Sequence, residues 1–137
     1  MSAIGDAGTE QHLVNTYFSA SAPYWRDVYQ GETVSATIYR ERREIVLGWI
    51  NELGTTAGER ALDIGCGAGS FSVALAELGF RVQAIDTVED MLRQTSALVR
   101  ERGVEGRVTV EAGDAHHLAH PDGSFDLVLA IGITPWL

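Results

Sequence analysis

The sequence contains no lysine and a single cysteine, Cys66. One cysteine excludes a disulfide framework and any zinc site built on paired cysteines, and it is typical of a reducing compartment. The longest apolar run, Leu127–Ile133, is far shorter than the roughly 20 residues that cross a bilayer. The first ten residues carry two acids where a secretory signal would begin with basic residues. These absences predict a cytoplasmic chain with no membrane-spanning helix.

Positive charge is scarce as well. All 10 basic residues are arginines, and 19 acidic residues oppose them, which gives a net charge of −9. A negative field repels phosphate backbones and anionic lipids, so nucleic acids and membrane surfaces are not expected partners. The densest basic cluster, Arg40, Arg42 and Arg43, is interleaved with Glu41 and Glu44. This mixture is typical of a solvated helix face.

The 137 residues, 45% of them hydrophobic, suffice for one domain. The pattern of apolar residues changes near Gly54. Residues 1–54 predict a helical extension, because their apolar residues recur at helical spacing. The expected elements are a helix at Thr9–Phe18, a turn at Ser21–Pro23, a short helix at Trp25–Tyr29 and a helix at Ala36–Leu53. Gly54 would end the last helix in a left-handed conformation.

Residues 55–137 alternate short apolar runs with helical stretches. The predicted strands are Ala61–Ile64, Arg81–Ile85, Val108–Glu111 and Phe125–Ile131, and the predicted helices are Ser70–Leu78 and Glu89–Arg102, the second capped by Thr87. Apolar strands that alternate with helices predict parallel strands covered on both faces. The predicted fold is therefore a doubly wound, Rossmann-like α/β sheet behind a helical extension.

Acidic residues follow three of the predicted strands at the point where each strand ends. Asp63 ends the first strand, Asp86 closes the second, and Asp114 follows the third. A single acid in such a place is usually a turn former or a helix cap. Ligands of open parallel sheets, however, bind outside the carboxyl ends of the strands, where the strand order reverses. We therefore expect the three carboxylates to face one cleft.

A glycine-rich loop, Gly65–Gly69, follows the first predicted strand. Glycines let the chain turn sharply and let a ligand lie against the backbone. Asp86 lies 21 residues after Gly65, close to the roughly 20-residue offset of a carboxylate that binds ribose hydroxyls. The loop and this acid together predict a nucleoside site.

Ser70 and Asp63 bear on which nucleoside is bound. A dinucleotide loop G-x-G-x-x-G needs a third glycine where this sequence has Ser70. Asp63 would also repel a pyrophosphate at the start of the following helix. S-adenosylmethionine carries an ammonium and a sulfonium and no phosphate, so it suits the acidic loop better than NAD. An NAD-dependent oxidoreductase stays as the alternative enzyme class.

Three segments of the sequence resemble the class I S-adenosylmethionine-dependent methyltransferases, especially those that act on small molecules. The segments are Leu62–Gly69, Asp86–Leu92 and a third made of Gly113–Ala115, Leu118 and Pro121–Val128. Ala119 and His120 depart from the family's pattern in this third segment. The resemblance runs from about Gly58 to the C-terminus, and Phe18–Tyr29 is similar to the family's variable cap. It implies bound S-adenosylmethionine and a small-molecule acceptor that is methylated by in-line displacement.

By position, the resemblance implies cofactor-binding roles for ten residues. Asp63 would meet the methionine ammonium, Asp86 the ribose hydroxyls, and Asp114 the adenine amino group. Gly65 and Gly67 would allow close approach of the ligand. The remaining members are Cys66 in the loop, Thr87 and Met91 bordering the adenine, Ala115 beside it through its backbone, and Ile131 (or Gly132) at the methyl-donor end.

The resemblance also implies further strands after the fourth. Phe125–Ile131 is apolar on both faces, and with nothing beside it the strand would leave an open edge. We expect a C-terminal continuation or a partner chain to cover that edge. The chain then divides into a helical cap, residues 1–54, and an incomplete cofactor-binding portion, residues 55–137.

No catalytic residue is identified from the sequence. His12, His116 and His117 are candidate general bases, and nothing in the pattern selects among them. No metal site is expected, because the cluster of His116, His117 and His120 has no cysteine nearby. A module that binds S-adenosylmethionine without an acceptor site is a third alternative.

Overall fold

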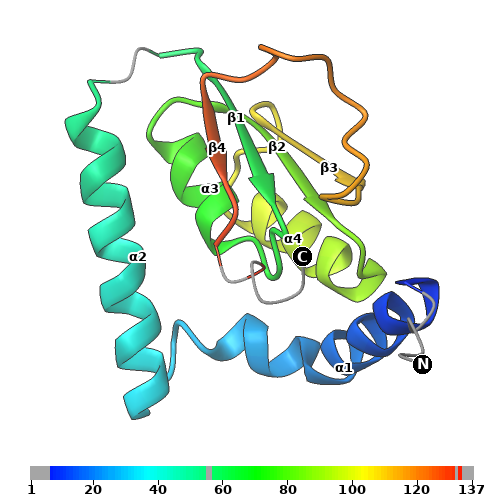
Figure 1. The fold of residues 1–137 in the computed structure, drawn as a ribbon. Helices are drawn as coiled ribbons and strands as arrows, with labels where there is room; N and C mark the ends of the chain where they lie inside the picture. Colours follow the sequence, from blue (N-terminus) through cyan, green and yellow to red (C-terminus); the bar gives the residue numbers. More distant parts are fainter. Residues whose placement is uncertain (1–6, 55–56, 132, 134–137) are drawn as a thin grey trace.

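A computed structural model describes residues 7–54, 57–131 and 133 of the chain. Its centre is a four-stranded parallel sheet in the order β3-β2-β1-β4 (Figure 1). The strands are β1 (Arg60–Ile64), β2 (Arg81–Asp86), β3 (Val108–Ala112) and β4 (Leu127–Leu129). The chain steps from β1 to β2 to β3 and then returns to the other side of β1. The strand order therefore reverses beside β1, where an open α/β sheet places its ligand.

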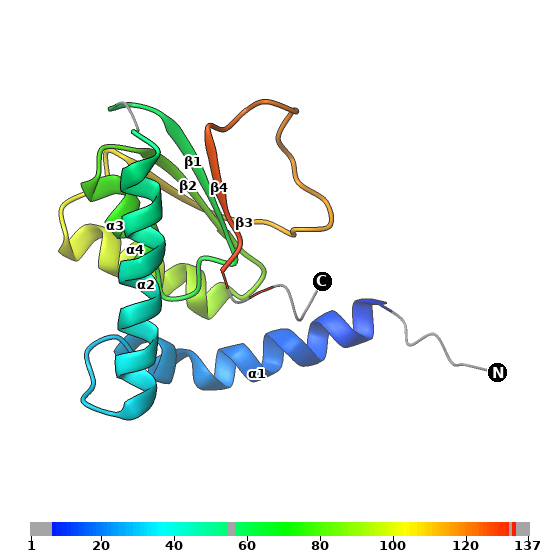
Figure 2. The ribbon, with the colours of Figure 1, turned by 60° about the vertical axis from the view of Figure 1, so that its left-hand side comes forward.

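Four helices accompany the sheet: α1 (Ala7–Asp27), α2 (Val34–Glu52), α3 (Ser70–Glu77) and α4 (Glu89–Glu101). Helices α3 and α4 cover one face, where they form the main core with strand residues such as Ala61, Val82 and Ala84. Figure 2 shows the β3–β4 connection on the opposite side of the sheet from these helices. Phe125 and Ala115 of that connection pack there against Leu62, Ile64 and Ile85. The α/β prediction is confirmed, although a loop rather than a helix covers the second face.

Helix α1 continues through Pro23, so the predicted turn at Ser21–Pro23 and the separate helix after it are wrong. Phe18, Ala22 and Trp25 recur at helical spacing and pack together against Val88 and Met91. This shared contact favours one continuous helix over the break that a proline suggests locally.

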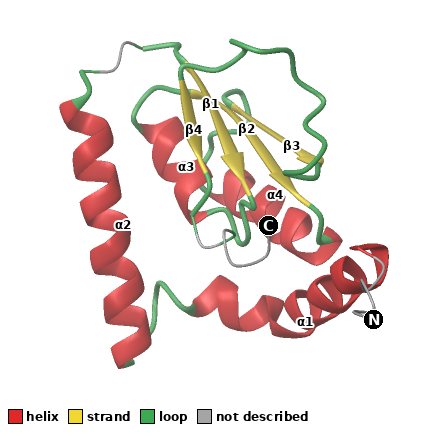
Figure 3. Ribbon diagram, viewed as in Figure 1, coloured by secondary structure: helices red, strands yellow, loops and turns green. Residues whose placement is uncertain are grey.

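Helix α2 begins two residues earlier than predicted and is capped by Thr33, whose hydroxyl accepts a 3.1 Å hydrogen bond from the backbone N–H of Ala36. Among its apolar residues α2 buries Ala36, Val46 and Ile50. Trp49 and Leu53 are 63% and 70% exposed. Figure 3 shows α2 standing beside α3 at the β4 side of the sheet. No described helix has both the length and the hydropathy needed to cross a membrane.

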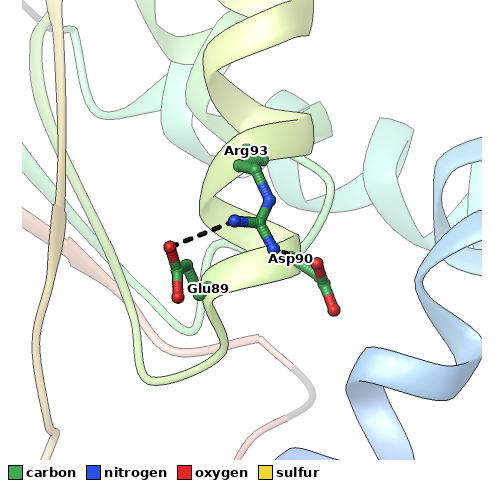
Figure 4. Close-up of polar contacts among 3 residues, drawn as sticks. All are labelled: Glu89, Asp90 and Arg93. Carbon is green, nitrogen blue, oxygen red and sulfur yellow. Dashed lines mark hydrogen bonds and ion pairs between the residues drawn. The ribbon is translucent and has the colours of Figure 1, made fainter.

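Helix α4 begins at Glu89 as predicted, but its cap differs from the prediction. Its N-cap residue is Val88, not Thr87, and no side chain caps it in the usual way. Instead, a carboxylate oxygen of Asp86 accepts a 2.9 Å hydrogen bond from the Val88 N–H. In the first turn Arg93 pairs with both Glu89 and Asp90 (Figure 4). These pairs are exposed, so they add little to stability beyond the favourable placement of acids at a helix N-terminus.

Strand β4 is shorter than the predicted Phe125–Ile131. Before it, Asp126 fixes the start of β1: its carboxylate accepts the Arg60 N–H, and its own N–H donates to the Arg60 carbonyl, both at 2.8 Å. Among the described strands β4 pairs only with β1, and Val128 is 52% exposed. The described sheet therefore has an open edge at β4.

Candidate functional site

A cavity of about 380 Å³ lies at the carboxyl ends of the strands. One wall is the end of the sheet, and residues of α1, α2 and the loop between them contribute the other. All ten predicted site residues line the cavity: Asp63, Gly65, Cys66, Gly67, Asp86, Thr87, Met91, Asp114, Ala115 and Ile131. The three carboxylates therefore share one hollow. Gly132 and the segment 134–137 lie outside the described residues.

The glycine loop turns the chain from β1 into α3 beside the cavity. The backbone N–H groups of Gly65 and Cys66 both donate to the carbonyl of Ile85, at 2.9 and 3.0 Å. Gly65 and Gly67 have φ values of +69° and +56°, which favour glycine. A Cβ at Gly67 would meet no protein atom within 4 Å. The backbone at Gly67 thus borders open space that a ligand can approach closely.

Asp86 holds this loop in place. One carboxylate oxygen accepts the Gly67 N–H at 3.0 Å, and the other accepts the Val88 N–H at 2.9 Å. Burial raises the pKa of Asp86, and these backbone hydrogen bonds oppose that shift. Each carboxylate oxygen has a second lone pair, so Asp86 can still accept hydrogen bonds from a ligand in the cavity.

Asp63 is the most buried acid of the site, with only 3% of its surface exposed. The hydroxyl of Ser72 donates to it at 2.6 Å. Burial raises the pKa of Asp63 to about 6, against the opposing effect of the Ser72 hydrogen bond, and the nearby charge of Asp86 adds to the rise. No arginine among the described residues forms an ion pair with Asp63. The charge of this buried carboxylate is therefore not balanced by an arginine within the described residues.

Cys66 fills the tight turn of the glycine loop. Its thiol lies 3.5 Å from the hydroxyl of Thr95, which in turn donates to the Gly67 carbonyl at 2.7 Å. Burial raises the pKa of the thiol, and the charge of Asp63 adds to this effect. A thiol with a raised pKa is a poor nucleophile, so Cys66 contributes shape rather than reactivity.

Asp114 lies at the rim of the cavity. One carboxylate oxygen accepts the backbone N–H of His116 at 2.9 Å, and the side chain is 41% exposed. Of the three candidate general bases, His116 lines the cavity, whereas His12 and His117 do not. Within the described ranges, no group of three or more His, Cys, Asp or Glu side chains is placed to hold a metal ion.

The second wall was not predicted residue by residue. It consists mainly of polar and aromatic side chains, with one valine, from the N-terminal helices and their connection: Gln11, Val14, Asn15, Phe18, Trp25, Tyr29, Tyr39 and Arg42. The Arg42 guanidinium lies 5.0 Å from the centre of the Tyr39 ring, and the Tyr39 ring is 5.5 Å from that of Trp25. Arg42 is the one arginine that lines the described cavity. The cap-like segment Phe18–Tyr29 was the only sequence signal for this wall.

Neighbouring contacts hold Tyr29 of this wall against Arg43, which does not line the cavity. The Arg43 guanidinium lies 5.0 Å from the centre of the Tyr29 ring and donates to the hydroxyl of Ser70 at 2.6 Å. Burial raises the pKa of Tyr29, and the charge of Arg42 opposes that rise. These contacts join the α1–α2 connection to the start of α3.

Comparisons with known proteins bear most directly on the part of the chain that forms the sheet side of the cavity. A family described as "Methyltransferase domain" matches residues 61–136. The chain is 38% identical over 80 residues to the methyltransferase GfsG of Streptomyces halstedii, covering 58% of this chain and 29% of that protein. It is 41% identical over 83 residues to the ubiquinone biosynthesis O-methyltransferase of Burkholderia vietnamiensis, covering 60% and 35%. The chain therefore spans about a third of the length of these relatives.

A solved structure is similar over most of the chain. It is the magnesium protoporphyrin IX methyltransferase of Synechocystis PCC 6803 with bound SAH, at a TM-score of 0.75 and 27% identity. The match covers 86% of this chain and 56% of that one. The resemblance thus extends beyond the glycine loop to the arrangement of the elements around the cavity.

Proposed function

The chain belongs to the methyltransferase domain family, and we propose that it forms the cofactor-binding portion of an S-adenosylmethionine-dependent methyltransferase of small molecules. The observation that carries this proposal is the distribution of charge in the cavity. Three carboxylates line the sheet side, and one guanidinium lines the helix side. A zwitterionic nucleoside without phosphate groups fits this arrangement, whereas a pyrophosphate would meet the buried carboxylate of Asp63.

Each charged group has a partner on such a ligand. We propose that Asp63 binds the methionine ammonium, directly or through water, and that Arg42 binds the methionine carboxylate. Asp86 would accept the two ribose hydroxyls, and Asp114 the adenine amino group. The open backbone at Gly67 would lie against the ligand, with Thr87, Met91 and Ala115 bordering the adenine and Ile131 the methyl-donor end.

The protein's work in methyl transfer is then largely binding and orientation. S-adenosylmethionine, when bound, supplies a methyl group that its sulfonium already activates. Asp63, Asp86 and Arg42 would fix the ligand along the cavity, so that an acceptor can approach in line with the transferred methyl group. The apolar side chains of Ile131 and Ile133 line the same cavity and exclude water from their side of it.

The relatives suggest the nature of the acceptor. GfsG is named a methyltransferase, and the Burkholderia relative an O-methyltransferase of ubiquinone biosynthesis. We therefore propose a small organic acceptor that is methylated on oxygen. The net charge of −9 disfavours nucleic acid as the acceptor.

Two proposals concern the organisation of the chain. Residues 1–54 would act as a cap on the cofactor-binding portion, since α1 and α2 supply one wall of the cavity. A further strand, from a continuation of the chain or from a partner, would pair with the open edge of β4, where Val128 is exposed. A cytoplasmic location is proposed from the single, buried Cys66.

Calorimetric titration of the chain with S-adenosylmethionine, S-adenosylhomocysteine and NAD tests the function. We expect both adenosyl ligands to bind and NAD to bind more weakly than either. Tighter binding of NAD would favour the oxidoreductase alternative. Binding of neither adenosyl ligand would contradict the proposed cofactor. If the complete protein binds the cofactor but methylates no acceptor, the non-catalytic module would replace the enzyme.

Replacing Asp86 by alanine is expected to weaken binding of S-adenosylhomocysteine by about 1.5–3 kcal/mol, the scale of a hydrogen bond to a charged group. The substitution also leaves the N–H groups of Gly67 and Val88 without their acceptor, so thermal unfolding should be measured alongside. Asp122→Ala, in an exposed loop outside the cavity, is the control. Unchanged affinity in Asp86→Ala would remove Asp86 from the binding site.

A further inference from the structure

Helix α1 lies across the carboxyl ends of β1 and β2 (Figures 1 and 2). Gln11, Val14, Asn15, Phe18 and Trp25 all line the cavity from this helix. A ligand in the cavity is therefore held between the glycine loop on one side and α1 on the other. How firmly α1 is docked must then affect how long the ligand stays.

The two halves of α1 differ in how much apolar surface they bury against the rest of the protein. Its C-terminal half packs through Phe18, Ala22 and Trp25 onto Val88 and Met91, in a cluster separate from the main core. In its N-terminal half, Leu13 and Tyr17 are 64% and 59% exposed. A helix end with so little buried apolar surface opens more readily than the core. Polar contacts therefore have a large share in holding this end of α1.

These polar contacts converge on Thr87. Its hydroxyl donates to the side-chain oxygen of Asn15 at 2.9 Å, and the Asn15 amide donates to the Thr87 carbonyl at 3.3 Å. The Gln11 amide donates to the Asn15 oxygen at 2.8 Å and to the Thr87 hydroxyl at 3.4 Å. Further along α1, Ser19 hydrogen-bonds Asp90. Asn15 is the centre of this network, since it contacts Thr87 through both its donor and its acceptor.

Thr87 follows Asp86 directly, and Asp86 holds the Gly67 backbone. The network thus joins α1 to the turn that carries the proposed ribose-binding carboxylate. We propose that Asn15 is a positioning residue that fastens α1 over the bound cofactor through Thr87 and thereby slows cofactor release. The proposal rests on the proposed cofactor site. It assigns to the N-terminal helix a part in ligand retention that the sequence patterns of residues 55–137 do not contain.

Docking of α1 and binding of the cofactor must favour each other. If the cofactor binds more tightly when α1 is docked, the bound cofactor stabilises the docked helix by the same free energy. Exchange of α1 amide hydrogens should therefore slow when S-adenosylhomocysteine is added. Loss of the Asn15 contacts should speed that exchange and the release of the ligand together.

The first test is Asn15→Ala, with stopped-flow measurement of S-adenosylhomocysteine binding. Loss of the two hydrogen bonds between Asn15 and Thr87 should raise the dissociation rate constant about tenfold, with little change in the association rate constant. Alanine is the better helix former, so α1 should stay helical. Thr16→Ala is the matched control: the Thr16 hydroxyl bonds only within α1, to the His12 carbonyl, and both rate constants should stay at their original values.

Thr87→Val removes the hydroxyl and keeps the size of the side chain. Combined with Asn15→Ala, it should raise the dissociation rate constant less than the product of the two single effects, because both changes remove the same hydrogen bond. Independent, multiplicative effects would contradict the network. Unchanged dissociation and unchanged α1 hydrogen exchange in Asn15→Ala would overturn the proposal, even with the cofactor site intact.

Failure of the cofactor site itself would look different. The unaltered chain would then show no binding of S-adenosylhomocysteine at all. In that case hydrogen exchange of the ligand-free chain still measures how firmly α1 is docked. Asn15→Ala should speed exchange of the amides around position 15, and Thr16→Ala should not. Equal exchange in the two variants would overturn the fastening role.

Discussion

Replacing Asp63 by asparagine is expected to raise the free energy of unfolding at neutral pH by about 2–3 kcal/mol while weakening S-adenosylmethionine binding about tenfold or more. The stabilisation follows because burial raises the pKa of Asp63 from 3.8 to about 6, so folding with a charged carboxylate is costly. Asparagine carries no charge, and its oxygen can still accept the Ser72 hydrogen bond. Binding weakens because the substitution removes the carboxylate charge that is proposed to bind the ammonium of the ligand. Chemical denaturation and calorimetry measure the two effects.

The pH dependence of stability distinguishes two causes of the stabilisation, removal of a buried charge and better packing. Because the folded pKa of Asp63 lies above its unfolded value, its contribution to stability is fully present below about pH 4 and is lost as the pH rises through about 6. Ligand affinity should run the other way, falling about tenfold per pH unit below 6 as Asp63 becomes protonated. Asp63→Asn should lose the share of both dependences that Asp63 contributes, and Asp122→Asn, in an exposed loop, should keep it. A variant no more stable than the original chain at pH 8 would contradict this account.

Replacing Gly65 by alanine should destabilise the chain by about 2–4 kcal/mol. Gly65 has a φ of +69°, and a Cβ there would overlap a methyl carbon of Ile133. The backbone would have to shift, which would disturb the paired hydrogen bonds of Gly65 and Cys66 to the Ile85 carbonyl. Ligand affinity should therefore fall together with stability. Denaturant titration and calorimetry give both values.

Gly48→Ala is the matched control for this glycine. Gly48 lies within α2, and a Cβ there would meet nothing within 4 Å. Alanine should stabilise that helix by about 0.5–1 kcal/mol. Equal effects at the two positions would show that the shape of the glycine loop is less restricted than the φ value and the Ile133 contact indicate.

Much of the sheet and one wall of the cavity could be predicted from local patterns. Asp63, Asp86 and Asp114 were expected to share a cleft because parallel strands place their carboxyl ends at one edge, and they do line one cavity. The boundaries of β1, β2 and β3 differ from the predictions by one residue at most. These features depend on short-range alternation of strands, glycines and helices, which the sequence displays directly.

The second wall could not be predicted in the same way. The side of α1 that faces the cavity depends on how the whole helix docks, and no local pattern contains that information. Pro23 suggested a break, yet the packing of Phe18 and Trp25 keeps α1 continuous. Thr87 is of a residue type that is common at helix N-caps, but its hydroxyl donates to Asn15, 72 residues earlier. Long-range contacts decided each of these cases.

The hydrogen bonds of Asp86 have a consequence for the energetics of recognition. Its carboxylate joins the Gly67 backbone to the start of α4. The glycine loop that would hold the proposed nucleoside is therefore ordered without a ligand. The entropy of ordering the glycine turn is then lost during folding and does not reduce affinity a second time. The other wall of the cavity is built by residues of α1 and α2, so variation in these helices would change ligand preference while the glycine loop keeps its hydrogen bonds to Asp86 and Ile85.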